Sequence, residues 1–255
     1  MKIIKLTFTL LLSIFTLALF AQDFPALVKP EQTEFYEPKV KKVDAATVVG
    51  NAPSDAIVLF DGKNFDKWER ADSAVHGSPV GWKINTDGSM TVVPRSKAIR
   101  TKQEFNDFQL HIEWKSPIEP ATRQGQGRGN SGVFLQGRYE VQVLNSRESE
   151  TYVNGQAGSI YKQTSPMVNA CRKEGEWNTY DIIYTAPRFR KNGSVEKPAY
   201  VTVIHNGIIV QNHFEIQGTT EYIGTPKWIA HGKGPIELQD HSNEVSYRNI
   251  WIREL

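Results

Sequence analysis

Apolar and polar side chains alternate along much of this chain from residue 56 on, in short segments separated by turn residues. A period of two is typical of strands that bury one face of a sheet. No amphipathic helix of three or more turns interrupts the series, which predicts an all-β sandwich or jelly roll rather than a parallel α/β sheet. The segments expected to be strands are 56–62, 90–94, 108–115, 131–137, 138–145, 179–186, 200–207, 208–216, 234–240 and 246–255.

The stretch GNSGVFLQGRYEVQVLNS, residues 129–146, reads as strand and separates its side chains by parity. Its apolar set, which predicts a face packed in the core, is Val133, Leu135, Tyr139, Val141 and Val143. Its polar set is Gln136, Arg138, Glu140 and Gln142. A solvated face would fit this parity. Amides and an arginine beside an aromatic residue favour instead the floor of a groove that binds a polar ligand.

The first 21 residues read as an export signal, with Lys2 and Lys5 before an apolar run that ends at Ala21. No cysteine follows that run to carry a lipid anchor, and the single Cys171 allows no internal disulfide. Residues 22–55 are expected to form a strap or linker with at most one short helix, ahead of one domain at 56–255. We expect a periplasmic or secreted protein that makes no membrane contact once the signal is cleaved.

The charge balance argues against two classes of partner. A net charge of +2, from 30 basic and 28 acidic residues, gives no electrostatic basis for binding nucleic acid or an anionic membrane. The run GRGNSG at 127–132 matches the letters of a dinucleotide-binding loop. That loop must lead into a helix whose N-terminus meets the phosphate, whereas a strand is expected here. We therefore interpret it as a loop at the rim of the groove.

One strand resembles the signature of a glucanase in spacing and departs from it in chemistry. Jelly-roll glucanases of the laminarinase type carry Glu-x-Asp-x-x-Glu, and the same spacing here reads Glu140, Gln142 and Asn145. Ordinary glycosidases use two carboxyl groups, roughly 5 Å apart when configuration is retained. This strand supplies one. An ordinary β-glucanase is therefore disfavoured, unless Glu113 or Asp240 approaches from a neighbouring strand.

Two further groups of side chains could carry chemistry. In the closing segment, His241 follows Asp240 where a strand ends, which fits a general base, half of a metal site, or a turn-capping Asp beside an exposed His. His111 and Glu113 lie two residues apart on one strand face and are the candidate ligands for a divalent metal ion.

Five ordered blocks of the sequence resemble one bacterial family. The blocks are IVLFDGKNFDKW, GNSGVFLQGRYEVQVLNS, AGSIYKQTSP with EWNTYDIIY, VIHNG, and GPIELQDHSNEVSYRNIWIREL. From about residue 56 to 255 the chain is similar to the 3-keto-disaccharide hydrolases, also described as 3-keto-glucoside lyase and 3-keto-2-hydroxy-glucal hydratase domains. The resemblance implies a concanavalin A-like jelly-roll sandwich of two antiparallel sheets, in agreement with the strand pattern.

The resemblance also implies a reaction, cleavage of 3-keto-glycosides or 3-keto-disaccharides by elimination and hydration. A ketone at C3 acidifies the C2 hydrogen, so that a base can remove it while an arginine or a divalent metal ion holds the enolate. An acid protonates the leaving oxygen, and hydration follows. This chemistry needs one good base rather than a carboxylate pair. A non-catalytic sugar-binding jelly roll is the alternative.

Matching the family's blocks to this chain gives the candidate residues. Glu140 and His241 are the expected base and acid, in either order, with Arg138 or Arg248 holding the negative charge. The residues expected to bind the sugar are Asn130, Gln136, Gln142, Tyr161, Gln239, Asp240 and Arg248.

Overall fold

The strand pattern of the sequence is realised as two packed antiparallel sheets in the computed structural model, which describes residues 29–72, 76–147 and 149–255. The chain divides into a unit that ends at Lys42 and a compact unit from Val43 to Leu255. The expected export signal, residues 1–21, lies outside the described residues. Within the described ranges, no helix is both long and apolar enough to cross a membrane.

The regular elements of the described chain are strands and three short 3-10 helices, η1 (Pro30–Thr33), η2 (Gly125–Gly127) and η3 (Val153–Gly155). The strands are β1 (Ile57–Phe60), β2 (Trp68–Arg70), β3 (Lys83–Ile84), β4 (Met90–Thr91), β5 (Ile99–Thr101), β6 (Phe108–Lys115), β7 (Ser131–Leu135), β8 (Tyr139–Val143), β9 (Asn178–Thr185), β10 (Arg188–Phe189), β11 (Val195–Lys197), β12 (Tyr200–His205), β13 (Ile208–Glu215), β14 (Glu237–Leu238) and β15 (Ser246–Glu254).

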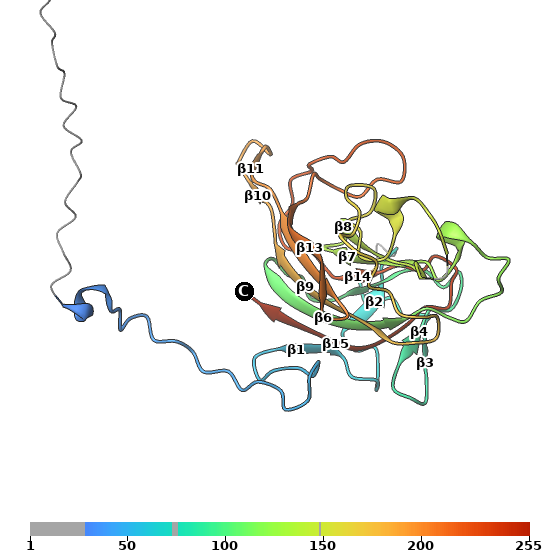
Figure 1. Ribbon diagram of the computed structural model, residues 1–255, viewed down its shortest axis with the longest axis horizontal. Coiled ribbons are helices and arrows are strands. Elements are labelled where there is room, and N and C mark those ends of the chain that lie inside the picture. The colour runs from blue at the N-terminus through green and yellow to red at the C-terminus, as the bar shows by residue number, and fades with distance from the viewer. Residues whose placement is uncertain (1–28, 73–75, 148) are drawn as a thin grey trace, which may run out of the picture. The chain divides into compact units, whose positions relative to one another are not determined.

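The larger sheet has eight strands in the order β13-β12-β9-β6-β15-β4-β3, with β1 also paired to β15. The smaller sheet has five, in the order β2-β5-β14-β7-β8, and β10 pairs with β11 in a separate ribbon. Figure 1 shows the two layers, with β7, β8 and β14 in one and β6, β9 and β15 in the other. The predicted all-β class and the concanavalin A-like jelly-roll sandwich are confirmed.

The core lies between the sheets and is built from the parities that the sequence predicted. On β6, the side chains of Phe108, Leu110, Ile112 and Trp114 are fully buried. From the smaller sheet, Val133 and Leu135 of β7 and Val141 and Val143 of β8 are fully buried as well. Each such side chain stabilises the fold by about 1.5–3 kcal/mol relative to an exposed one. The opposite face of β7 and β8 is therefore free to form a binding surface.

Two tight turns define strand ends. Asn206 and Gly207 join β12 to β13 with φ values of 52° and 81°, the conformation that the Asn-Gly pair favours in a hairpin. Gln136 and Gly137 form a second turn, between β7 and β8, with φ values of 53° and 64°. Residues 129–146 are thus a hairpin rather than one strand. Counting every second residue through the turn still identifies the core side chains correctly. It assigns Gln136 to the cavity face, whereas this residue lies in the turn itself.

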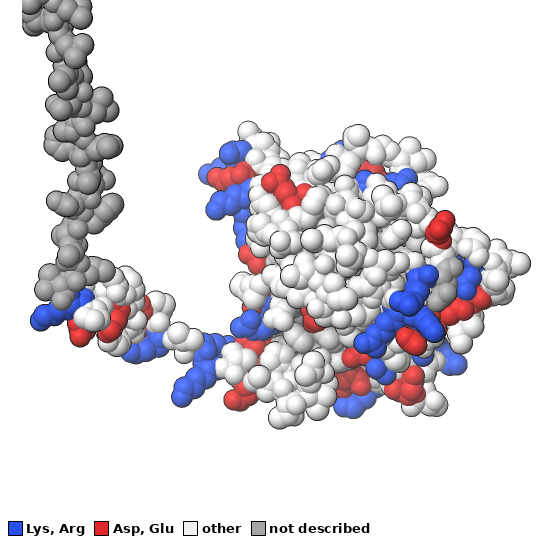
Figure 2. All heavy atoms as spheres, in the orientation of Figure 1, with Lys and Arg blue, Asp and Glu red and all other residues white. Residues whose placement is uncertain are grey.

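The stretch expected to be a strap, residues 22–55, is in part docked on the domain. From Val43 on it belongs to the compact unit, and the Gly50 carbonyl accepts hydrogen bonds from Asn249 Nδ2 and Trp251 Nε1 of β15, both at 2.8 Å. Acidic and basic side chains are interspersed over the face of this unit that Figure 2 shows. This mixture agrees with the small net charge of the sequence.

Candidate active site

A cavity of about 510 Å³ lies on the face of β7 and β8 that points away from the core. Alternate residues of the two strands reach it, because Phe134 is paired with Glu140 across the hairpin and Val133 and Val141 face inward. Loops supply the rest of the lining. The lining residues are Gln126, Asn130, Phe134, Glu140, Gln142, Tyr152, Tyr161, Lys162, Thr220, Tyr222, Gln239 and His241.

Glu140 is the carboxyl group of this lining. Its side chain is 4% exposed, and its backbone is fixed on both sides. The backbone amide donates to Thr220 Oγ1 at 2.9 Å, and the carbonyl accepts from the backbone amide of Tyr161 at 3.1 Å. The loops that carry Thr220 and Tyr161 are thus held against the strand that carries the carboxyl group.

Burial, together with a smaller effect of the nearby charge of Glu237, raises the pKa of Glu140 to about 8. Glu237, on β14, is paired with Phe134, which is paired in turn with Glu140, so the three lie in one row across the sheet. Burial also raises the pKa of Glu237, to about 7, against the opposing charge of Arg100. At neutral pH Glu140 is therefore mostly protonated and can donate a proton.

Amide side chains surround the carboxyl group at the floor of the cavity. Gln142 Nε2 lies 3.0 Å from Gln126 Oε1, and Asn130 Nδ2 donates to the Gln126 carbonyl at 2.7 Å. Turning the Gln142 amide over places its nitrogen 2.9 Å from Glu140 Oε1. Among the described residues, the buried Gln239 Oε1 has no hydrogen-bond partner. The floor can thus both accept from and donate to the hydroxyl groups of a ligand.

A lysine and three tyrosines form the other side of the lining. Lys162 Nζ lies 4.4 Å from the centre of the Tyr222 ring, 5.8 Å from that of Tyr161 and 5.9 Å from that of Tyr152. The same ammonium donates to the carbonyl of Tyr222. The hydroxyls of Tyr152 and Tyr161 are hydrogen-bonded at 2.6 Å. Lys162 therefore places a positive charge among three aromatic rings.

The structure brings together six of the residues that the sequence singled out. The candidates that line the cavity are Asn130, Glu140, Gln142, Tyr161, Gln239 and His241. His241, which is exposed, and Gln239 arrive from the segment after β14, some hundred residues beyond the hairpin. The loop at 127–132 leads into β7 rather than into a helix, and Asn130 of that loop lies at the cavity.

Two residues of the hairpin lie outside the lining. Gln136 is fully buried at the turn, where its Nε2 donates to the Phe105 carbonyl at 2.8 Å and its Oε1 accepts from the Tyr184 hydroxyl at 2.9 Å. It is a structural side chain, and the expectation that it binds sugar is corrected. Arg138 donates to the Gln136 carbonyl at 2.8 Å and likewise does not line the cavity.

Two residues of the closing segment also lie elsewhere. Asp240 caps a turn, accepting from the backbone amides of Lys97 and Ser242 at 2.9 and 2.8 Å. Arg248 lies on β15 of the other sheet, where it pairs with Glu113 at 2.6 Å and stacks over Trp177. Neither lines the cavity.

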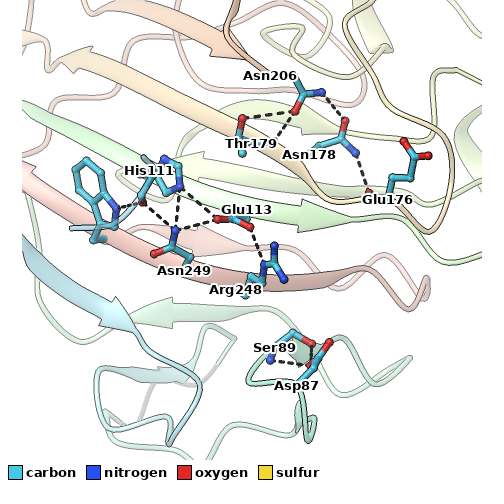
Figure 3. Close-up of polar contacts among 12 residues, drawn as sticks. Asp87, Ser89, His111, Glu113, Glu176, Asn178, Thr179, Asn206, Arg248 and Asn249 are labelled. Atoms are coloured by element: carbon cyan, nitrogen blue, oxygen red, sulfur yellow. Dashed lines mark hydrogen bonds and ion pairs between the residues drawn. The ribbon is translucent and has the colours of Figure 1, made fainter. Parts of the chain in front are cut away.

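The two candidate metal ligands lie on the outer face of the larger sheet, as Figure 3 shows with Arg248 and Asn249 beside them. Both ring nitrogens of His111 are engaged: Nδ1 lies 2.7 Å from Asp181 Oδ1, and Nε2 lies 3.3 Å from Asn249 Nδ2 and 3.8 Å from Glu113 Oε1. Burial would lower the pKa of His111, but the hydrogen bonds to Asp181 and Glu113 outweigh it and raise the pKa to about 9.

The donor atoms of this pair are already used by their neighbours, since His111 Nδ1 lies 2.7 Å from Asp181 and Glu113 accepts from Arg248 at 2.6 Å and from Asn249 at 2.9 Å. Across the described ranges of the chain, no group of three or more His, Cys, Asp or Glu side chains is arranged to hold a metal ion. We therefore interpret His111 and Glu113 as part of an ion-pair network that stabilises the sheet.

Half of the lining was not anticipated from the sequence. The residues missed are Gln126, Phe134, Tyr152, Lys162, Thr220 and Tyr222. Phe134 could have been found, since it shares strand parity with Gly132 and points away from the core. The loop residues carry no periodicity, and only the fold brings them to the hairpin.

Comparison with known proteins gives the family context of this site. Residues 55–253 match the model of the 3-keto-alpha-glucoside-1,2-lyase-like domain. The crystal structure of a candidate glycosyl hydrolase from Parabacteroides distasonis ATCC 8503 is 53% identical with a TM-score of 0.83, covering 90% of this chain and 98% of that one. No curated protein matches the chain significantly.

A second structure from the same organism, also described as a candidate glycosyl hydrolase, shares the fold. It is 24% identical with a TM-score of 0.58, and the match covers 84% of this chain and all of the other.

Proposed function

Because the chain belongs to the 3-keto-alpha-glucoside-1,2-lyase-like domain family and is a carbohydrate-active enzyme, we propose that it cleaves the glycosidic bond of 3-keto-glycosides, 3-keto-disaccharides among them. The observation that carries the proposal is Glu140. It is a buried carboxyl group with a pKa raised to about 8, and the described lining holds no second carboxyl group beside it. Such a site suits elimination, which needs one proton donor and one base, better than a reaction that needs two carboxyl groups.

The first half of the reaction is an elimination. The ketone at C3 makes the C2 hydrogen acidic, and His241 takes it as the C2–H bond breaks. The electron pair passes into the enolate of C2 and C3. When the enolate collapses, the bond between C1 and the glycosidic oxygen breaks, and that oxygen takes the proton of Glu140. The products are the free leaving alcohol and an unsaturated 3-keto sugar.

The second half is a hydration that uses the same two groups in their new states. Glu140 is now a carboxylate and accepts a proton from water as the water oxygen bonds to C1. His241 is now protonated and, because it is exposed, exchanges that proton with water before it delivers a proton to C2. The sum is hydrolysis, and both residues regain their starting states. The raised pKa of Glu140 supports its role as the acid of the first half, because the group is protonated near neutral pH.

Lys162 is the group that we propose to stabilise the enolate. The sequence suggested Arg138 or Arg248, and neither lines the cavity. Among the described lining residues, Lys162 is the one lysine or arginine. A positive charge in a partly enclosed site stabilises a developing oxyanion more strongly than it would in water. Asn130, Gln142 and Gln239 would bind sugar hydroxyls at the floor.

A non-catalytic sugar-binding module is the competing function, since amides and tyrosines would suit it equally. The two are separated by incubating purified protein with 3-keto-trehalose and following the products by chromatography, with and without a chelator. Release of glucose supports the enzyme, and binding without cleavage supports the module. Activity that survives the chelator supports Lys162 as the enolate stabiliser, whereas activity lost with the chelator assigns that role to a metal ion.

A further inference from the structure

The lining of the cavity changes character from floor to mouth. At the floor, the side chains of Gln142, Asn130 and Glu140 are only 1%, 4% and 4% exposed. Tyr152 and Tyr222, which we call the rim tyrosines, are 41% and 72% exposed. A polar floor thus leads outward to an aromatic rim. Exposed aromatic rings at the edge of a cavity are typical of binding surfaces.

Tyr222 is exposed and yet anchored. Lys162 donates to its backbone carbonyl, and the same ammonium lies 4.4 Å from the centre of its ring. Two residues earlier in the chain, Thr220 accepts the hydrogen bond from the backbone amide of Glu140. The position of the ring is therefore tied to the strand that carries the buried carboxyl group.

Tyr152 is held by packing on a glycine and by a hydrogen bond of its hydroxyl group. A Cβ built on Gly155 would lie 2.1 Å from Tyr152 Cε2, so the ring rests directly on a glycine backbone. Its hydroxyl is hydrogen-bonded to that of Tyr161, which is 9% exposed. Rings held in this way offer contact area to a ligand at little cost in conformational entropy.

The change from a buried polar floor to an exposed aromatic rim favours one direction for a bound glycoside. The reacting bond must lie beside Glu140, and β7 and β8 close the cavity behind that residue. The keto sugar then occupies the polar floor, and the leaving group points toward the mouth. A cavity of about 510 Å³ has room for more than one six-membered sugar ring.

We propose that Tyr152 and Tyr222 form the subsite for the leaving group and that this subsite selects disaccharides, whose second sugar ring stacks on the tyrosines. The inference rests on the proposed function. A pyranose offers an apolar C–H face to an aromatic ring and hydroxyl groups at its edge.

The test compares two substrates that share the keto sugar, 3-keto-trehalose and methyl 3-keto-glucoside, in four proteins. These are the wild type, Tyr222→Ala, Tyr222→Phe and the neighbouring Ile223→Ala, a residue that is 83% exposed and does not line the cavity. Circular dichroism and melting temperatures confirm that each variant is folded. The readout is kcat/KM for each substrate.

The proposal predicts that Tyr222→Ala lowers kcat/KM about tenfold for the disaccharide, from the lost burial of the second ring, and leaves the methyl glycoside within about twofold. Tyr222→Phe, which keeps the ring, and Ile223→Ala should both resemble the wild type. An equal loss on both substrates, or no loss on either, overturns the subsite. A wild type that cleaves neither substrate overturns the proposed function itself and the subsite with it.

Discussion

Glu140 occupies the space that the missing side chain of Gly132 leaves open on the neighbouring strand. A Cβ built on Gly132 would lie 2.4 Å from Glu140 Oε1 and 3.0 Å from its Cγ. Gly132 has no positive φ that would demand glycine, so the need for it here is steric. The hairpin of β7 and β8 is therefore shaped around the position of this one carboxyl group.

Gly132→Ala should displace the Glu140 carboxyl group and lower kcat/KM by at least about tenfold, because a shift of about 1 Å in a reacting group costs up to a hundredfold. The overpacking should lower stability by about 1–3 kcal/mol. Gly232→Ala is the matched control, since a Cβ there meets nothing within 4 Å. Full activity in Gly132→Ala would show that the exact place of Glu140 is unimportant.

Glu140→Gln should lower turnover by about 10²- to 10⁴-fold, which is the rate enhancement that a general acid usually provides. It should also change how stability depends on pH. The pKa of Glu140 is raised to about 8 in the folded protein, so the stability that the protonated group contributes is fully present below its unfolded pKa and is lost as pH rises through 8. The glutamine of the variant does not ionise, so its contribution to stability does not change with pH.

Melting temperatures measured from pH 4 to pH 9 check the second point. The difference between Glu140→Gln and the wild type should move in favour of the variant as pH rises. A difference that stays constant with pH would mean that the group is not held protonated.

Glu237→Gln should lower the pKa of Glu140. Glu237, with its own pKa near 7, ionises first as pH rises, and its charge then opposes the ionisation of Glu140. In the proposed reaction Glu140 is the acid, so activity should fall as it ionises. The alkaline limb of the profile of kcat/KM against pH should therefore move to lower pH in the variant. Glu254→Gln, which removes an exposed carboxylate paired with Lys233, should leave the limb in place.

His111→Phe should destabilise the protein and leave kcat/KM unchanged, because its network lies on the other sheet. The pKa of His111 is raised to about 9, so its contribution to stability is full below its unfolded pKa of 6.5 and is lost as pH rises through 9. We expect a cost of about 3 kcal/mol at pH 6, shrinking toward pH 10. Loss of activity in a folded variant would contradict this assignment.

Strand parity predicted the core well because burial repeats every second residue wherever a sheet has one dry face. It identified Val133 and Val141 as core and Glu140 and Gln142 as the opposite face. It failed at Gln136 because a turn reverses the chain there, and the pair Gln-Gly is a weaker turn signal than Asn-Gly. The sequence did not predict strands β2, β3, β5, β10 and β11. Each has only two or three residues, which is too few to show an alternating pattern.

Parity also could not tell which polar face carries the site. His111 and Glu113 share a polar face on β6 just as Glu140 and Gln142 do on β8. The segment around Gly50 packs on the first face and turns it into a structural network. Loops that carry Lys162 and Tyr222 enclose the second and form the cavity. These are contacts between distant parts of the chain, which no local pattern records.

Loss of a proton from C2 is the step that distinguishes the proposed elimination and hydration from ordinary hydrolysis of the glycosidic bond. The most direct measurement is to run the reaction with a 3-keto-glycoside in D₂O and locate deuterium in the 3-keto-glucose formed. Substrate and product incubated without enzyme, and product incubated with enzyme, correct for exchange beside the ketone. We predict one deuterium at C2 from the earliest turnovers. Product that keeps its original hydrogen at C2 would rule out elimination.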